Sequence, residues 1–194
     1  MSLSSIKKSF LFLAVLVAIS SCANQSIQTI DLDISLKNIQ SNYGNYKKVK
    51  LEIYDERENK NFIGKKIVGG IFVNINSNQS LIDLVQNNIT IALKLKGFDP
   101  GNDKVFEVHI ANFEYYAKRD FFIGHSKANI LFKIVVRDKY DTNKRYQKNY
   151  GLTINKDHFI MPLMKTDEAT INYMLQEIFN DIFKDNNLMD NLRS

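Results

Sequence analysis

The chain has 194 residues, of which 44% are hydrophobic and 24% charged, so it is neither a disordered chain nor a polytopic membrane protein. A single Cys excludes a disulfide framework and a multi-cysteine metal site. The formal net charge of +5 falls to +3 once Lys7 and Lys8 are removed, and this mild excess does not indicate a nucleic-acid partner.

Residues 1–21 have the pattern of a secretory signal peptide. Lys7 and Lys8 precede an apolar run from Phe10 to Ile19. This run has about half of the ~20 residues that a membrane-spanning helix needs, so we expect it to direct export and then to be removed.

The signal peptide ends in a motif similar to the lipobox of bacterial lipoproteins, Ile19-Ser20-Ser21-Cys22. It predicts cleavage between Ser21 and Cys22, with diacylglycerol on the Cys22 thiol and an acyl chain on the new amino group. Two or three acyl chains hold a protein on a membrane permanently, since each buried CH₂ contributes roughly 0.8 kcal/mol. By the sorting convention of enteric bacteria, Ala23 favours the outer membrane. The alternative is that Cys22 lies by chance near an ordinary cleavage site.

Residues 22–46 are polar and read as a tether, in which alternation from Ile30 to Leu36 allows a short edge strand. Residues 49–54 alternate more clearly and predict a strand. Residues 58–78 read as a long connection that contains one short strand, at 71–75.

Ser80 and Asp83 predict the start of a helix, because a Ser N-cap with an acidic residue three positions later satisfies free N–H groups. Leu81, Val85, Ile89, Ala92 and Leu93 follow at helical spacing. Gly97 predicts the helix end, since glycine adopts the left-handed conformation without steric penalty.

Three strands follow. The first runs through Phe106, Val108 and Ile110, and it needs a bulge near Ala111-Asn112 to keep Phe113 and Tyr115 on the same face. The second, Ala128 to Val136, has the longest alternation in the chain and is predicted to be central. The third carries Tyr146, Tyr150, Leu152 and Ile154 toward the same core.

A second helix is predicted to begin at a Thr166 cap, with Asp167 and Glu168 favourably placed in its first turn. Its apolar stripe is Ile171, Leu175, Ile178 and Ile182. The order of elements predicts an α+β fold, a two-layer sandwich with a mostly antiparallel sheet of about four to five strands and two helices packed on one face. Residues 47–194 form a single α+β domain in this interpretation.

The chain resembles the YajG-type family of bacterial lipoproteins. The resemblance rests on the succession of the lipobox, Asp55-x-Arg57, Ile63-Gly64, Lys96-Gly97-Phe98, Lys127-Ala128-Asn129-Ile130 and Lys148-Asn149-Tyr150. It implies a small lipid-anchored envelope protein with no established chemistry. In the order of its elements alone, the chain is also similar to the lipopolysaccharide-assembly lipoprotein LptE.

The residues predict no catalytic and no metal site. Asp55 and Arg57 fall on one side of a strand end, where a structural ion pair is favoured over catalysis. His109, His125 and His158 lie on separate elements without ligand spacing. We expect no cofactor beyond the acyl chains on Cys22.

One strand connection, residues 115–125, is aromatic and basic where a polar turn is usual. Its candidate contact residues are Tyr116, Lys118, Arg119, Phe121 and Phe122. They could contact a partner protein or a lipid headgroup layer, or Phe121 and Phe122 could fold back over the sheet.

The sequence therefore predicts a non-enzymatic adaptor, lipid-anchored at the periplasmic face of the outer membrane, that binds an envelope protein. The alternative is a carrier that shelters an acyl or glycolipid ligand between sheet and helices. A third hypothesis is an envelope hydrolase that uses Asp55 or His125.

Overall fold

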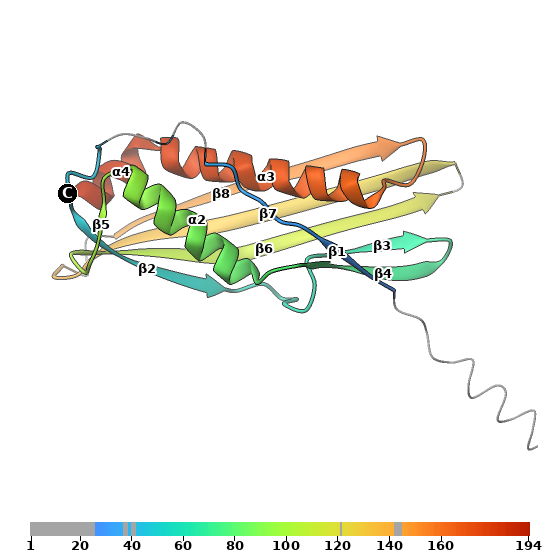
Figure 1. Ribbon diagram of the computed structural model, residues 1–194, viewed down its shortest axis with the longest axis horizontal. Helices are drawn as coiled ribbons and strands as arrows, with labels where there is room; N and C mark the ends of the chain where they lie inside the picture. Colours follow the sequence, from blue (N-terminus) through green and yellow to red (C-terminus); the bar gives the residue numbers. More distant parts are fainter. Residues whose placement is uncertain (1–25, 37–38, 40–41, 121, 142–144) are drawn as a thin grey trace, which may run out of the picture.

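The computed structural model describes residues 26–36, 39, 42–120, 122–141 and 145–194. In this part of the chain eight strands form one mixed sheet, and helices cover one of its faces (Figure 1). The α+β class is confirmed. The predicted sandwich of four to five mostly antiparallel strands with two helices is too small, since the described residues form eight strands and three helices.

The strands are β1 (Ser26–Ile30), β2 (Lys48–Asp55), β3 (Gly64–Val68), β4 (Ile71–Ser77), β5 (Asp99–Pro100), β6 (Lys104–Asp120), β7 (Ile123–Asp138) and β8 (Arg145–His158). The helices are α2 (Leu81–Leu95), α3 (Met164–Lys184) and α4 (Asn186–Arg193).

The long strand β6 organises the sheet. One of its edges pairs antiparallel with β7 from Lys104 to Asp120, and β7 pairs in the same way with β8. Its other edge pairs in parallel with β2 and, further along, with β3. The sheet continues from β3 through β4 to β1, and from β2 to β5.

The predicted bulge is present in β6, where the pairing with β7 shifts between Ile110 and Asn112. After the extra residue, the side chains that would have pointed to one face of the sheet point to the other. As a result Phe113 and Tyr115 stay buried on the same face as Phe106, which the helices cover.

The predicted ends of α2 are confirmed. The Ser80 side chain accepts a hydrogen bond from the Asp83 N–H at 3.4 Å. At the other end Gly97 has a φ of +84°, and the Phe98 N–H donates to the Leu93 carbonyl at 3.0 Å. Buried Phe98 closes this Schellman motif against the core.

The apolar stripe predicted for the last long helix is buried in α3, but the predicted Thr166 cap is wrong. The helix begins at Met164, and its N-cap Leu163 makes no side-chain cap bond. In the first turn the Asp167 side chain is buried instead, and it pairs with Lys66 of β3.

The chain turns at Asp185 into α4, which the sequence analysis did not predict. The Asp185 carboxylate caps α4 at the Leu188 N–H and also accepts hydrogen bonds from Tyr150 at 2.7 Å and Lys148 at 2.5 Å. It therefore ties the junction of the two C-terminal helices to β8.

Part of the predicted tether, 22–46, belongs to the folded domain. β1 pairs with β4, and after it Leu32 and Ile34 are buried beside α3. The Asp33 N–H donates to the Asn172 side chain of α3 at 3.0 Å. Residues 1–25, which include the signal peptide and Cys22, lie outside the described residues.

Candidate interaction surface

Three connections meet at one end of the sheet, at the right of Figure 1. The β3–β4 turn lies beside the end of β6, because Ile67 pairs with Lys118. The β6–β7 turn follows directly. The β8–α3 connection joins them, since the backbone of Ile160 and Met161 packs against Gly124.

These connections expose a cluster of apolar side chains, which we call the apolar end. Its nine residues are Val68, Ile71, Phe72, Phe122, Ile123, Phe159, Ile160, Leu163 and Met164. The most exposed are Phe159 at 94%, Phe122 at 81% and Leu163 at 74%. Monomeric soluble domains rarely leave such a cluster in water, so this end is a candidate contact surface.

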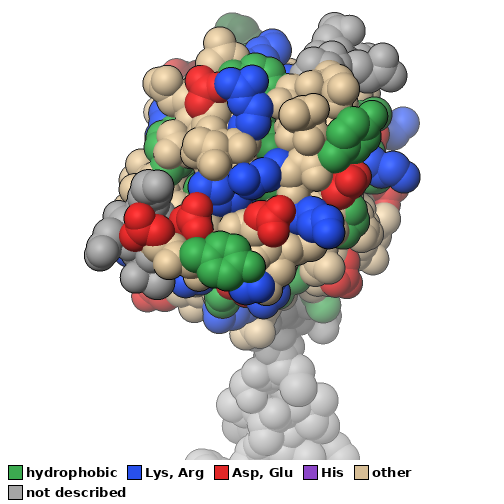
Figure 2. Space-filling view, turned by 90° about the vertical axis from the view of Figure 1, so that its left-hand side faces the viewer, with side chains coloured by type: hydrophobic (Ala, Val, Ile, Leu, Met, Phe, Trp, Pro, Cys, Tyr) green, Lys and Arg blue, Asp and Glu red, His purple; other side chains and the backbone are tan. Residues whose placement is uncertain are grey.

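The opposite end of the molecule, which includes Tyr140 of the β7–β8 turn and which we call the polar end, has a different surface. Figure 2 shows basic and acidic side chains interspersed there, with separate hydrophobic side chains between them. Isolated exposed hydrophobic residues are normal for a surface in water. The exposed apolar cluster is therefore confined to one end of the domain.

The residues predicted for the tip lie at this end. Phe122 is exposed and does not fold back over the sheet, whereas Tyr116 is half-buried. The Lys118 ammonium lies 2.7 Å from the Asp120 carboxylate, and this hydrogen bond raises the pKa of Lys118. Arg119 is exposed, and Phe121 lies outside the described residues.

A buried ion pair lies behind the apolar end, and the sequence analysis did not predict it. Asp167 of α3 is fully buried and contacts the Lys66 ammonium of β3 and the Tyr115 hydroxyl of β6. Gln28 of β1 donates to the same carboxylate at 3.2 Å. Burial, reinforced by the hydrogen bond to Asp167, raises the pKa of Tyr115. The cluster joins four elements of the fold.

The other predicted polar residues do not converge on one cleft: Asp55 and Arg57 line a pocket of about 230 Å³, and none of the three histidines lines it. Arg57 binds Asp55 through two hydrogen bonds of 2.9 and 2.8 Å, as the predicted structural pair requires, and Arg57 lowers the pKa of Asp55. His125 lies 2.7 Å from Asp157, and His158 lies 2.7 Å from Ser126. Within the residues that the structure covers, no three His, Cys, Asp or Glu side chains are grouped to hold a metal ion.

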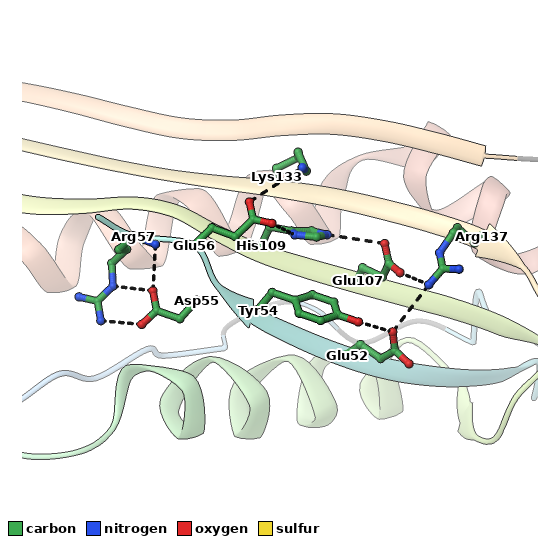
Figure 3. A network of polar contacts seen from close by, with 9 residues as sticks. All are labelled: Glu52, Tyr54, Asp55, Glu56, Arg57, Glu107, His109, Lys133 and Arg137. Carbon is green, nitrogen blue, oxygen red and sulfur yellow. Dashed lines mark hydrogen bonds and ion pairs between the residues drawn. The ribbon is translucent and has the colours of Figure 1, made fainter. Parts of the chain in front are cut away.

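A charged network crosses the helix-free face of the sheet (Figure 3). Its acids and bases alternate in space: Glu52, Arg137, Glu107, His109, Glu56 and Lys133. His109 Nδ1 lies 2.6 Å from Glu56 Oε1. Tyr54 stacks on the His109 ring with centroids 4.9 Å apart. Each carboxylate faces Arg137 or Lys133, so we interpret the network as a way to cover an open sheet face with compensated charge.

A family model described as an uncharacterized lipoprotein matches residues 34–193 of the chain. The chain belongs to this lipoprotein family. The resemblance to the YajG-type lipoproteins is thereby confirmed. Family membership implies a membrane-anchored protein of the cell envelope. None of the helices within the described residues is long and apolar enough to span a membrane.

Two solved structures are similar to this lipoprotein. Protein XCC0632 from Xanthomonas campestris is 9% identical, with a TM-score of 0.53 over 81% of this chain and 92% of that chain. This likeness shows a shared fold and nothing about function. A putative neuraminyllactose-binding hemagglutinin homolog from Helicobacter pylori is 6% identical, with a TM-score of only 0.33 over 88% of this chain and 91% of that chain. Among curated proteins none matches the chain.

Two pockets of the lipoprotein bear on the carrier hypothesis. A cavity of about 160 Å³ lies between α2 and β2, lined mainly by Val49, Leu51, Leu93 and Phe98. A larger one of about 590 Å³ lies where β2 ends and β3 begins along β6, and its lining combines charged Glu58, Lys65 and Glu114 with Phe62, Ile63 and Phe113. The apolar pocket is smaller than the roughly 300 Å³ at which ligand sites begin, and the larger pocket is partly charged.

Proposed function

We propose that this lipoprotein is a non-enzymatic binding or assembly adaptor, anchored by lipid on Cys22 at the periplasmic face of the outer membrane. The apolar end is the observation that carries the proposal, because several exposed apolar side chains at one end of a domain are typical of a contact surface. An adaptor makes two contacts, one with the membrane that holds it and one with its partner protein. Besides the apolar end, the helix-free face of the sheet and the polar end offer surfaces to an envelope protein.

The placement of the polar residues supports binding over hydrolysis. Asp55 is held by Arg57, and His125 and Asp157 face solvent as an exposed pair. A hydrolase would instead bring its acid, base and nucleophile together at one cleft.

The carrier alternative has less support. A carrier of an acyl or glycolipid ligand would need a continuous apolar cavity between sheet and helices. There the described side chains pack as one hydrophobic core, and the apolar pocket beside α2 holds about 160 Å³.

The anchor is tested by Cys22→Ser, which removes the thiol that would carry diacylglycerol. We expect the variant in the soluble periplasmic fraction after the membranes are washed, since without two or three acyl chains membrane binding is weak and reversible. Ser21→Ala is the matched control, because it keeps a small residue before the cysteine and should leave the protein in the membrane pellet. A washed pellet that retains Cys22→Ser as well as the natural protein would refute the anchor.

The partner is tested by photo-crosslinking in living cells, with probes at Phe122 of the apolar end, Asn155 of the helix-free face and Tyr140 of the polar end. We expect a single protein product from Asn155 or Tyr140 that saturates as the lipoprotein is expressed at higher levels and that mass spectrometry identifies. An adaptor predicts a protein product from at least one of the three positions. If no position captured a protein, the adaptor function would be wrong.

A further inference from the structure

We infer that the apolar end docks on the lipid bilayer that carries the anchor, with Phe72, Phe122 and Phe159 inserted at the boundary between headgroups and acyl chains. The inference rests on the lipidated Cys22 of the proposed function, and it assigns one of the two adaptor contacts to lipid.

The position of β1 supports this orientation. Ser26 pairs with Val73 of β4, which pairs with Lys66 of β3, which pairs with Ala117 of β6. Ser26 therefore enters the sheet level with Ala117, near the apolar end. Since β1 runs parallel to β4 and β4 runs away from the Gly69-Gly70 turn, the start of β1 points toward that end.

The reach of the chain restricts which end can meet the bilayer. Cys22 precedes Ser26 by only four residues, which extend over at most about 14 Å. From the level of Ala117 to the tip at Asp120 the strand rises about 10 Å. The polar end lies at the far end of β6, a strand of 17 residues that extends over about 55 Å. An anchor on Cys22 can therefore place the apolar end on the bilayer and cannot place the polar end there.

The chemistry of the apolar end suits a membrane interface. Its aromatic and aliphatic side chains come from three turns, and exposed charges of both signs lie close to them in the chain: Arg119, Lys156 and Lys165, with Asp120 and Asp157. Apolar residues that enter the interface while cations bind headgroup phosphates are typical of peripheral membrane contacts.

Sedimentation with vesicles tests the inference without any protein partner. The probe is the mature chain with Cys22→Ser, mixed with vesicles of 70% phosphatidylcholine and 30% phosphatidylglycerol. We expect binding, and we expect the triple variant Phe72→Ser, Phe122→Ser, Phe159→Ser to weaken it about tenfold or more. The matched control is Tyr46→Ser with Tyr140→Ser, which removes exposed aromatic residues outside the apolar end and should leave binding unchanged. Thermal unfolding should show that all of these variants are folded.

Fluorescence locates the contact. The chain has no Trp, so Phe122→Trp supplies a single fluorescent residue at the apolar end. Tyr140→Trp supplies one at the polar end. We expect a blue shift, and quenching by brominated lipids, only for Phe122→Trp. No vesicle binding by the unlipidated chain, or equal quenching of both reporters, would overturn the inference. A protein product from the Phe122 crosslinking probe without lipid products would also overturn it, while leaving the adaptor function intact.

Discussion

Replacing Asp167 with Ala is expected to lower the free energy of unfolding by about 3–5 kcal/mol. The carboxylate is fully buried, and the Lys66 ammonium that it neutralises has a side chain only 5% exposed. Removing one partner leaves a buried charge without compensation, and the Tyr115 hydroxyl and the Gln28 amide lose their acceptor as well. The loss is large beside the 5–15 kcal/mol that typically stabilises a domain.

Urea unfolding of two further variants makes this prediction specific. Lys165→Ala removes an exposed charge two positions away and should change the free energy of unfolding by less than about 0.5 kcal/mol. The double variant Lys66→Met, Asp167→Leu replaces both charges with apolar groups and should recover part of the stability, since the Tyr115 hydroxyl still lacks its acceptor. If Asp167→Ala were as stable as Lys165→Ala, the ion pair would not hold the fold together.

Replacing Asp185 with Ala is expected to cost about 2–4 kcal/mol, since one carboxylate serves two functions. It caps α4 at the Leu188 N–H, and the loss of a cap costs about 1 kcal/mol. It also accepts hydrogen bonds from Tyr150 and Lys148 of β8, and bonds to a charged acceptor contribute about 1.5–3 kcal/mol. Denaturant unfolding measures the sum, and a cost below about 1 kcal/mol would show that the hydrogen bonds to β8 contribute nothing.

The pH dependence of Asp185→Asn separates the charge from the cap, because the Asn side chain can still accept the hydrogen bond from Leu188. Burial alone would raise the pKa of Asp185, but hydrogen bonds from Lys148 and Tyr150 lower it from 3.8 to about 2. The charge therefore stabilises the fold fully above pH 3.8, and this stabilisation is lost as the pH falls through about 2. We expect the stability difference between the natural protein and Asp185→Asn to shrink over that range. A difference that stayed constant with pH would contradict this assignment.

Elements whose signals are local could be predicted from the sequence. The Ser80 cap, the Gly97 end of α2 and the bulge between Ile110 and Asn112 each depend on neighbouring residues, and each is present. β3 was missed because Lys65 and Lys66 occupy the two faces of a short strand, so alternation of polar and apolar residues is absent. Parallel pairing of β2 and β3 with β6 was also missed, since alternation has the same period in parallel and antiparallel sheets.

Features that depend on distant contacts could not be predicted. Asp167 in the first turn of a helix suggests a favourable charge near the dipole, and nothing local reports that Lys66, 101 residues earlier, is its partner. The start of α4 does have a local signal, because Leu188, Met189 and Leu192 follow the Asp185 cap at helical spacing and are buried. In the apolar end only the β6–β7 turn has a local signal, its aromatic residues near Phe122; the other two turns become its neighbours only through the register of the sheet.

The length of β6 and β7 has a consequence for how far the protein extends from its membrane. These strands have 17 and 16 residues and pair along their whole length, which makes a stiff ribbon of about 55 Å. If the apolar end lies on the bilayer, the ribbon holds the polar end at a fixed height above the membrane surface. A partner that binds the polar end would contact the lipoprotein at this height. Most small domains held close to the same membrane surface would not reach it.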